Sequence, residues 1–149
     1  MTAITQLVPS PAEERVQRLG AITHVALTVR DLDVSVPWYR AVTGAEPVLD
    51  EDTGPFRHVV FAFGATLLGL HAFPDPVHDV AFDPRRPGLD HVAFGCADPD
   101  ELSAWATRLD DMGIDHGEVV DAHYGHGLAF TDPDGLALEL FCPPQPARA

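Results

Sequence analysis

The fold is decided by a short segment that occurs twice, as HVAL at residues 24–27 and as HVAF at residues 91–94. The two copies lie 67 residues apart. Further matches follow at offsets of 68 and 69, such as His58 with His126 and Phe61 with Phe130. Agreement over this span predicts the duplication of one supersecondary unit. We therefore expect two similar halves that pack as a pseudo-twofold pair, with a cleft between them.

Each half reads as one strand, one helix and three further strands. Alternating, often β-branched apolar residues mark the strands, and apolar residues at helical spacing mark the helices. The expected elements of the first half are a strand at 21–29, a helix at 31–44 and strands at 48–49, 57–63 and 67–73. Those of the second half are a strand at 89–96, a helix at 98–113 and strands at 116–120, 127–131 and 136–141. Two βαβββ modules in tandem predict an α+β fold.

The expected helix ends follow from capping residues. Ser35 can cap the first helix, and Gly44 can adopt the left-handed conformation that stops it. In the second helix, Asp98 and Glu101 have the spacing of a capping box, and Gly113 follows the last apolar residue. Both helices are thus bounded at each end by residues that favour a helix boundary.

The chain divides into one folded region and two flanking segments. Residues 1–20 combine prolines with a charged run and scattered apolar residues, which indicates a loosely held arm. A stretch rich in proline and glycine separates the two modules and is typical of a linker. The expected boundaries are the arm at 1–20, module one at 21–73, the linker at 74–88, module two at 89–143 and a tail at 144–149.

Composition excludes several classes of partner. The 149 residues include 9 basic and 23 acidic side chains, which gives a net charge of −14, and every basic residue is arginine. Without lysine, neither a lysine Schiff base nor a Walker A phosphate site can form. The negative charge opposes binding to nucleic acid or to an anionic membrane. A small-molecule substrate is therefore the expected partner.

Neither the cysteines nor the N-terminal residues indicate export. The 2 cysteines form no CxxC pair, and residues 1–20 lack the apolar run of a secretory signal. The longest apolar stretch, residues 61–70, is about half as long as a bilayer span. We expect a cytoplasmic protein.

Strand alternation places four side chains of types that bind metals on the strand faces expected to line the cleft. In the first strand of each half, His24 or His91 is followed on its own face by small residues, while bulky residues occupy the other face. In the closing strands, His71 and Glu139 lie on the corresponding faces, at separations of 47 and 48 residues, which suggests that they are equivalent. Three imidazoles and one carboxylate suit a divalent transition metal such as Zn, Mn, Fe, Ni or Co.

The sequence resembles the vicinal oxygen chelate superfamily, which includes glyoxalases, methylmalonyl-CoA epimerases, fosfomycin-modifying enzymes, extradiol dioxygenases and bleomycin-binding proteins. The resemblance covers residues 21–143. It rests on HVAL at 24–27, residues 31–39 ending in Trp38-Tyr39, LDHVAF at 89–94, and FTDPDG at 130–135 followed by Leu138-Glu139-Leu140. It implies paired βαβββ modules whose sheets curl around a metal or ligand cleft.

The resemblance also implies the ligands and the reaction. The metal ligands of the family fall on His24, His91 and Glu139, with His71 at the fourth place, where glyoxalases have Glu and epimerases have Gln. It implies a divalent-metal-dependent lyase or isomerase of the glyoxalase type, acting through an enediolate-like intermediate on a small substrate held by two oxygens. The candidate catalytic residues are Glu139, His71 and His126. A homodimer is expected, and the family contains clefts formed within one chain and across two.

Two other functions stay open. An extradiol-type Fe(II) dioxygenase would use His24, His91 and Glu139 as its triad, but its relatives have a tyrosine ahead of the Asp-Pro turn where this chain has Ala129. A non-catalytic drug-binding protein would need no metal. Fosfomycin chemistry is disfavoured because the lysine-containing potassium loop of those relatives has no counterpart in a chain without lysine. Glutathione use is unsupported, since no arginine cluster can be assigned to its carboxylates.

Overall fold

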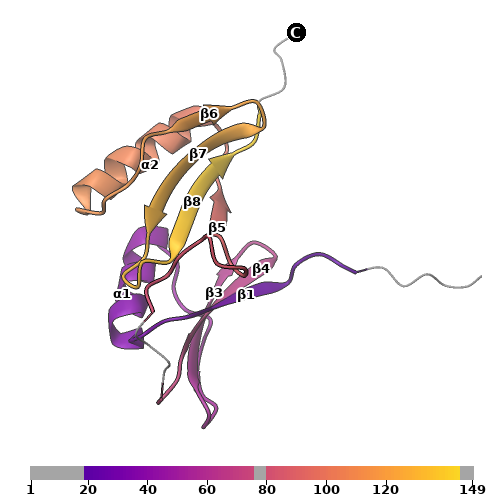
Figure 1. The fold of residues 1–149 in the computed structure, drawn as a ribbon, viewed down its shortest axis with the longest axis vertical. Coiled ribbons are helices and arrows are strands. Elements are labelled where there is room, and N and C mark those ends of the chain that lie inside the picture. Colours follow the sequence, from indigo (N-terminus) through magenta and orange to yellow (C-terminus); the bar gives the residue numbers. More distant parts are fainter. Residues whose placement is uncertain (1–18, 76–79, 145–149) are drawn as a thin grey trace, which may run out of the picture.

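The computed structural model describes residues 19–75 and 80–144, and each half forms a βαβββ module (Figure 1). Module one consists of β1 (His24–Thr28), α1 (Leu32–Thr43), β2 (Leu49–Asp52), β3 (Arg57–Phe63) and β4 (Thr66–Ala72). Module two consists of β5 (Val92–Gly95), α2 (Pro99–Asp111), β6 (Val120–Ala122), β7 (Gly125–Thr131) and β8 (Ala137–Cys142). The predicted α+β fold with two βαβββ modules is confirmed.

Each module forms one four-stranded mixed sheet. The strand orders are β1-β4-β3-β2 and β5-β8-β7-β6. β1 pairs in parallel with β4, and β5 pairs in parallel with β8, whereas the other neighbours are antiparallel. A parallel pair needs a long crossover connection. The helix and the two middle strands supply it, so the first and last strands of each module lie side by side.

The N-terminal cap of α1 differs from the prediction. Asp31, not Ser35, caps the helix, and Asp31 Oδ1 accepts the backbone N–H of Asp33 at 2.8 Å. Ser35 comes one turn later and is buried, because α1 begins earlier than a Ser35 cap requires. The remaining expected signals are confirmed except for the capping box of α2, because the Glu101 carboxylate accepts the N–H of Ala97, the residue before Asp98. Gly44 ends α1 in the left-handed conformation with a φ of 69°, and Asp98 caps α2.

Several strand bounds differ from those expected: β1 and β5 each begin three residues later, and two further strands differ in position or length. β6 covers Val120–Ala122 rather than 116–120, and His116 makes only an isolated bridge to Phe130. β2 extends to Asp52, beyond the expected 48–49. Both strands lie at the outer edge of their sheet, and all four residues of β2 are exposed. Without a buried face, they have no apolar alternation from which the sequence could predict their ends.

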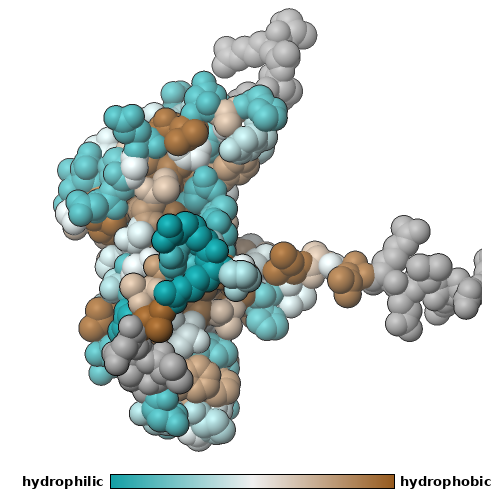
Figure 2. Space-filling view, viewed as in Figure 1, coloured by the Kyte–Doolittle hydropathy of each residue, from teal (hydrophilic) through white to brown (hydrophobic). Residues whose placement is uncertain are grey.

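One apolar core is shared by the two modules. Its fully buried members come from both halves and include Tyr39, Phe61, Leu70, Leu102 and Leu138. Both helices lie on the same side of the sheets, on the left in Figure 1. We call the opposite side of each sheet its open face. On the side shown in Figure 2, apolar side chains are scattered among hydrophilic ones.

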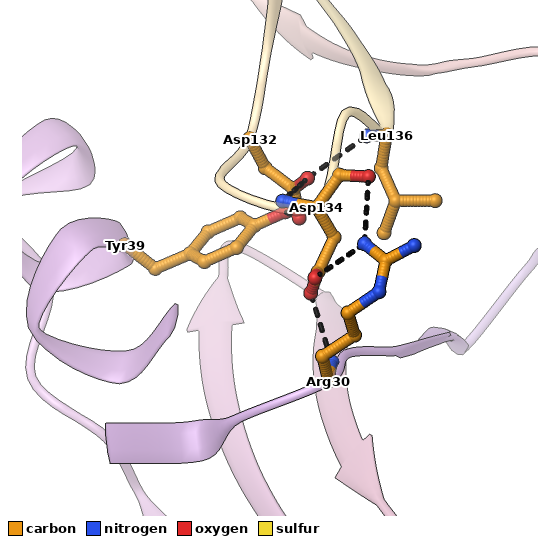
Figure 3. Close-up of polar contacts among 5 residues, drawn as sticks. All are labelled: Arg30, Tyr39, Asp132, Asp134 and Leu136. Carbon is orange, nitrogen blue, oxygen red and sulfur yellow. Dashed lines mark hydrogen bonds and ion pairs between the residues drawn. The ribbon is translucent and has the colours of Figure 1, made fainter. Parts of the chain in front are cut away.

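The Asp-Pro turn after β7 joins the two modules (Figure 3). The Tyr39 hydroxyl of α1 donates to Asp132 Oδ2 at 3.0 Å, and Asp132 Oδ1 accepts the N–H groups of Asp134 and Leu136 at 2.9 Å each. Arg30, which follows β1, donates to Asp134 from its backbone N–H at 2.9 Å and from its guanidinium at 3.0 Å. Because Tyr39 and Arg30 belong to module one, these bonds hold the last hairpin of module two against it.

The structure describes the folded region more fully than its flanks. Most of the expected arm at 1–20, part of the linker and most of the tail lie outside the described residues, so these boundaries stay a prediction. Within residues 19–75 and 80–144, neither helix is long and apolar enough to span a membrane.

Candidate functional site

His91 lies between two carboxylates just before β5. Its Nδ1 is 2.6 Å from Asp90 Oδ1, and its Nε2 is 3.2 Å from Glu139 Oε2. Glu139 comes from the neighbouring strand β8, where it lies opposite Ala93. The hydrogen bond with Asp90 raises the pKa of His91, and the negative charge of Glu139 raises it further. An imidazole and a carboxylate from adjacent strands are donors that divalent transition metals bind.

The position of Glu139 depends on a glycine in the neighbouring strand. Gly127 of β7 lies where a Cβ would collide with Glu139 Oε1. The same arrangement recurs next along the open face, where the Phe141 ring lies over Gly125. Side chains of β8 thus lean across β7 because two residues of β7 have no side chain. Gly127 thereby leaves room for the Glu139 carboxylate beside His91.

His24 occupies the matching place in module one. Its Nδ1 lies 3.0 Å from Thr23 Oγ1, as the Nδ1 of His91 lies beside Asp90. In both modules, therefore, the residue before the histidine contacts Nδ1. Such a contact orients an imidazole so that Nε2 is the nitrogen presented to a ligand.

His71 lies in an aromatic cluster on the open face of module one. Its ring stacks on Phe56 with 4.7 Å between centroids and an interplanar angle of 13°, and it meets the His58 ring edge-on at 5.2 Å. Burial lowers the pKa of His71, and the nearby His58 and His24 lower it further. A lowered pKa keeps the imidazole neutral, which is the form that binds metals. His58 Nε2 lies 3.3 Å from Glu51 Oε2.

Of the four candidate ligands, the structure brings His91 and Glu139 into direct contact. We define half-site one, on module one, by His24 and His71, which lie four positions apart along the β1–β4 register. Half-site two, on module two, consists of the contacting pair His91 and Glu139. Among residues 19–75 and 80–144, no three His, Cys, Asp or Glu side chains lie close enough together to hold a metal ion. The residue types fit a transition metal, but one chain presents them as two separate half-sites.

The expected equivalence of His71 and Glu139 is wrong by two residues. Glu139 lies opposite Ala93, the third residue of the repeated HVA segment in module two. The matching residue of module one, Ala26, lies opposite Gly69, whereas His71 lies opposite Thr28. The near-equal sequence separations suggested the wrong equivalence, because the connection between the first and last strands is three residues longer in module two. The register pairs His24–Leu67 and Val92–Leu138 demonstrate this difference.

His126, a candidate catalytic residue, lies on the other face of its sheet from Glu139. Glu139 is opposite Ala129, so alternation along β7 turns His126 away from the open face. The register partner of His126 is Cys142, which is fully buried on the helix side, and His126 Nδ1 lies 3.2 Å from Asp121 Oδ1. His126 therefore does not face the candidate ligands.

Sequence reasoning missed four residues around the candidate ligands. Thr23 and Asp90 could have been found, because each directly precedes a candidate ligand in the repeat and carries a side chain that can contact Nδ1. Phe56 and His58 gave no such signal. His58 was matched with His126, yet it pairs with His71 on the open face, since strand register rather than sequence offset decides the face.

A cavity of about 170 Å³ lies on the helix side of the sheets. Its lining is mostly apolar and includes Trp38 and Trp105, which pack against the core. None of the four candidate ligands lines this cavity. The cavity and the half-sites are therefore on opposite sides of the sheets.

The fold is that of a protein built from a duplicated βαβββ unit. The chain matches the Glyoxalase/Bleomycin resistance protein/Dioxygenase superfamily over residues 21–140, and it belongs to this superfamily. The resemblance to vicinal oxygen chelate proteins is therefore confirmed.

Relatives with known names differ in activity. Glyoxylase I 4 of Arabidopsis thaliana is 27% identical over 128 residues, which cover 82% of this chain and 70% of that protein. Metallothiol transferase FosB of Staphylococcus saprophyticus is 26% identical over 125 residues, with coverage of 82% and 76%. A glyoxylase/bleomycin resistance protein/dioxygenase domain from Frankia sp. EAN1pec has a crystal structure that matches with a TM-score of 0.76 at 30% identity, covering 85% of this chain and 100% of that one. Superfamily membership thus implies small-molecule binding without selecting one reaction.

Proposed function

We propose that the protein is a divalent-metal-dependent lyase or isomerase of the glyoxalase type. Its substrate would be a small molecule with two neighbouring oxygens, and the reaction would pass through an enediolate-like intermediate. The contact of His91 with both Glu139 and Asp90 is the observation that carries this proposal. Three imidazoles and one carboxylate suit Zn, Fe, Mn, Ni or Co.

The residues that would hold the metal are His24, His71, His91 and Glu139. A bound divalent metal supplies Lewis-acid stabilisation of negative charge on substrate oxygens. Thr23 and Asp90 would orient His24 and His91 through their Nδ1 atoms. Glu139 is the proposed proton-transfer group, because its carboxylate lies 3.2 Å from His91 and would be within reach of a substrate bound there.

We also propose that the complete site forms between two copies of the chain. Within one copy, the shared core and the Tyr39–Asp132 bond fix the modules with their half-sites apart. A twofold-symmetric dimer could place half-site one of each copy against half-site two of the other. Such a dimer would contain two complete sites, which ties the expected homodimer to metal binding.

Metal analysis of mixed dimers tests this proposal. His24→Ala and His91→Ala are each expected to abolish the metal content of protein purified without added metal. Coexpression of the two variants with different tags yields heterodimers in which one site carries both substitutions and the other carries none. The heterodimer should hold half as much metal as the wild type.

Two results of that experiment would overturn the proposal. If both single variants keep their metal, then His24 and His91 are not ligands. If the heterodimer is metal-free while the wild type binds metal, then the site does not form between two copies.

The reaction class is tested with aldehyde–thiol, epimerase and catechol substrates on metal-loaded protein. Turnover of an aldehyde–thiol adduct or of an epimerase substrate would support the proposal. Oxygen uptake with catechols and Fe(II) would instead select a dioxygenase, which Ala129 disfavours because it offers no hydroxyl opposite Glu139. Tight binding of a drug-like ligand unaffected by a chelator would select a non-catalytic binding protein.

Substitution of Asp90 by alanine is expected to weaken metal binding about 10–100-fold. The reason is that His91 loses the carboxylate that contacts Nδ1 at 2.6 Å. Asp90→Asn keeps an oxygen at this place and should lose less. Asp115→Ala, an exposed substitution elsewhere in module two, serves as the control. Chelator competition measures all four affinities, and equal values for wild type and Asp90→Ala would contradict an orienting role.

A further inference from the structure

The fourth ligand position of the candidate site has no side chain of its own. By register, the residue of module one that corresponds to Glu139 is Gly69. Both lie on the open face of the last strand, opposite an alanine of the repeated segment. A ligand at this position must therefore come from elsewhere in the module.

The His71 ring reaches back over Gly69. A Cβ at residue 69 would lie 3.2 Å from His71 Nε2 and 3.4 Å from its Cδ2. The stack on Phe56 and the edge of His58 contact the ring in this position. The His71 nitrogen thus lies beside the space that a side chain at position 69 would enter, and glycine leaves that space open.

We propose that Gly69 and His71 together supply the fourth ligand, with His71 Nε2 in the place of a side chain at position 69. This inference rests on the proposed metal-dependent function and adds a preference for charged substrates. A divalent metal held by three imidazoles and one carboxylate keeps a net positive charge, whereas a second carboxylate at position 69 would neutralise it. The site therefore favours substrates whose chelating oxygens are anionic, such as 2-oxo acids.

The first test moves the ligand between the two positions. Co(II) affinity is measured by chelator competition, with the visible absorption of bound Co(II) as a second readout. His71→Ala is expected to weaken binding about tenfold or more. Addition of Gly69→Glu or Gly69→Gln to His71→Ala is expected to restore it.

Matched glycine substitutions test the space above residue 69. Gly69→Ala should weaken Co(II) binding, because its Cβ would press on His71 Nε2. Gly95→Ala adds the same methyl group to the open face of module two, where nothing lies within 4 Å of a Cβ. It should leave the affinity unchanged, and an equal loss in both variants would contradict the proposed role of Gly69.

Oxalate binding, followed through the visible absorption of bound Co(II), tests the effect of the net charge of the metal site. The wild type and Gly69→Gln/His71→Ala have the same net charge at the metal site, so they should bind oxalate with similar affinity. Gly69→Glu/His71→Ala should bind it at least about tenfold more weakly. Equal oxalate affinity of the Glu and Gln variants would overturn the substrate preference.

Three outcomes separate this inference from the proposed function. The inference fails if His71→Ala binds Co(II) as the wild type does. It also fails if neither double variant recovers binding while circular dichroism shows a folded protein. Wild-type Co(II) binding that does not depend on His91 would instead overturn the proposed metal site itself.

Discussion

Replacement of Asp132 by alanine is expected to destabilise the protein by about 3 kcal/mol and to lower Tm by roughly 6–12 °C. The Asp132 carboxylate is only 5% exposed and accepts hydrogen bonds from the Tyr39 hydroxyl and from the N–H groups of Asp134 and Leu136. Alanine leaves these donors without their acceptor, and Tyr39 is fully buried. Thermal unfolding followed by circular dichroism measures the loss.

Asp132→Asn is the matched control for this prediction. Its amide oxygen can still accept the two N–H groups, and its amide nitrogen can donate to the Tyr39 hydroxyl, so its stability should lie within about 1 kcal/mol of wild type. A loss in Asp132→Asn as large as that in Asp132→Ala would show that the hydrogen bonds are not the cause.

The stability of wild type and that of Asp132→Asn are also expected to depend differently on pH. Burial raises the pKa of Asp132 above its ordinary value of 3.8. Since the folded state then holds the proton more tightly than the unfolded state, ionisation of Asp132 costs stability. The stability of wild type relative to Asp132→Asn should therefore fall as the pH rises from below 3.8 through the folded-state pKa. A difference that stays constant over this range would contradict the prediction.

Glu139→Gln is expected to lower kcat of the metal-loaded protein about 10²–10⁴-fold. Glutamine has the same shape, so it fits the space that Gly127 leaves, but it provides neither the negative charge nor the basic oxygen of Glu139. The expected loss therefore reports the chemistry of the carboxylate rather than its packing. Steady-state kinetics with the substrate found in the activity tests measures it.

The control for Glu139→Gln is Glu118→Gln, which makes the same change at an exposed residue of module two. Its kcat should equal that of wild type. If Glu139→Gln also kept kcat within about threefold of wild type, a free-energy change of less than about 1 kcal/mol, Glu139 could not be the proton-transfer group.

Local patterns were sufficient to predict the modules and the faces of their first and last strands. The repeated HVA segment predicted the duplication, and alternation correctly placed bulky residues of the first strand, such as Leu27 and Val29, in the core. These signals succeed because side-chain direction along a strand and conformation at a cap such as Gly44 depend on neighbouring residues. They failed at β2 and β6, where no buried face imposes an apolar pattern.

Local sequence patterns alone were therefore enough to predict the duplicated fold and the faces that carry His24, His91 and Glu139, and composition alone excluded lysine chemistry. Strand pairing in the folded chain was needed to establish that Gly69, rather than His71, is the counterpart of Glu139. A shift of two residues keeps a side chain on the same face, so alternation cannot detect it, and register is set by pairing between distant strands. The separation of the half-sites likewise arises from how the two modules pack through one shared core, which no local pattern encodes.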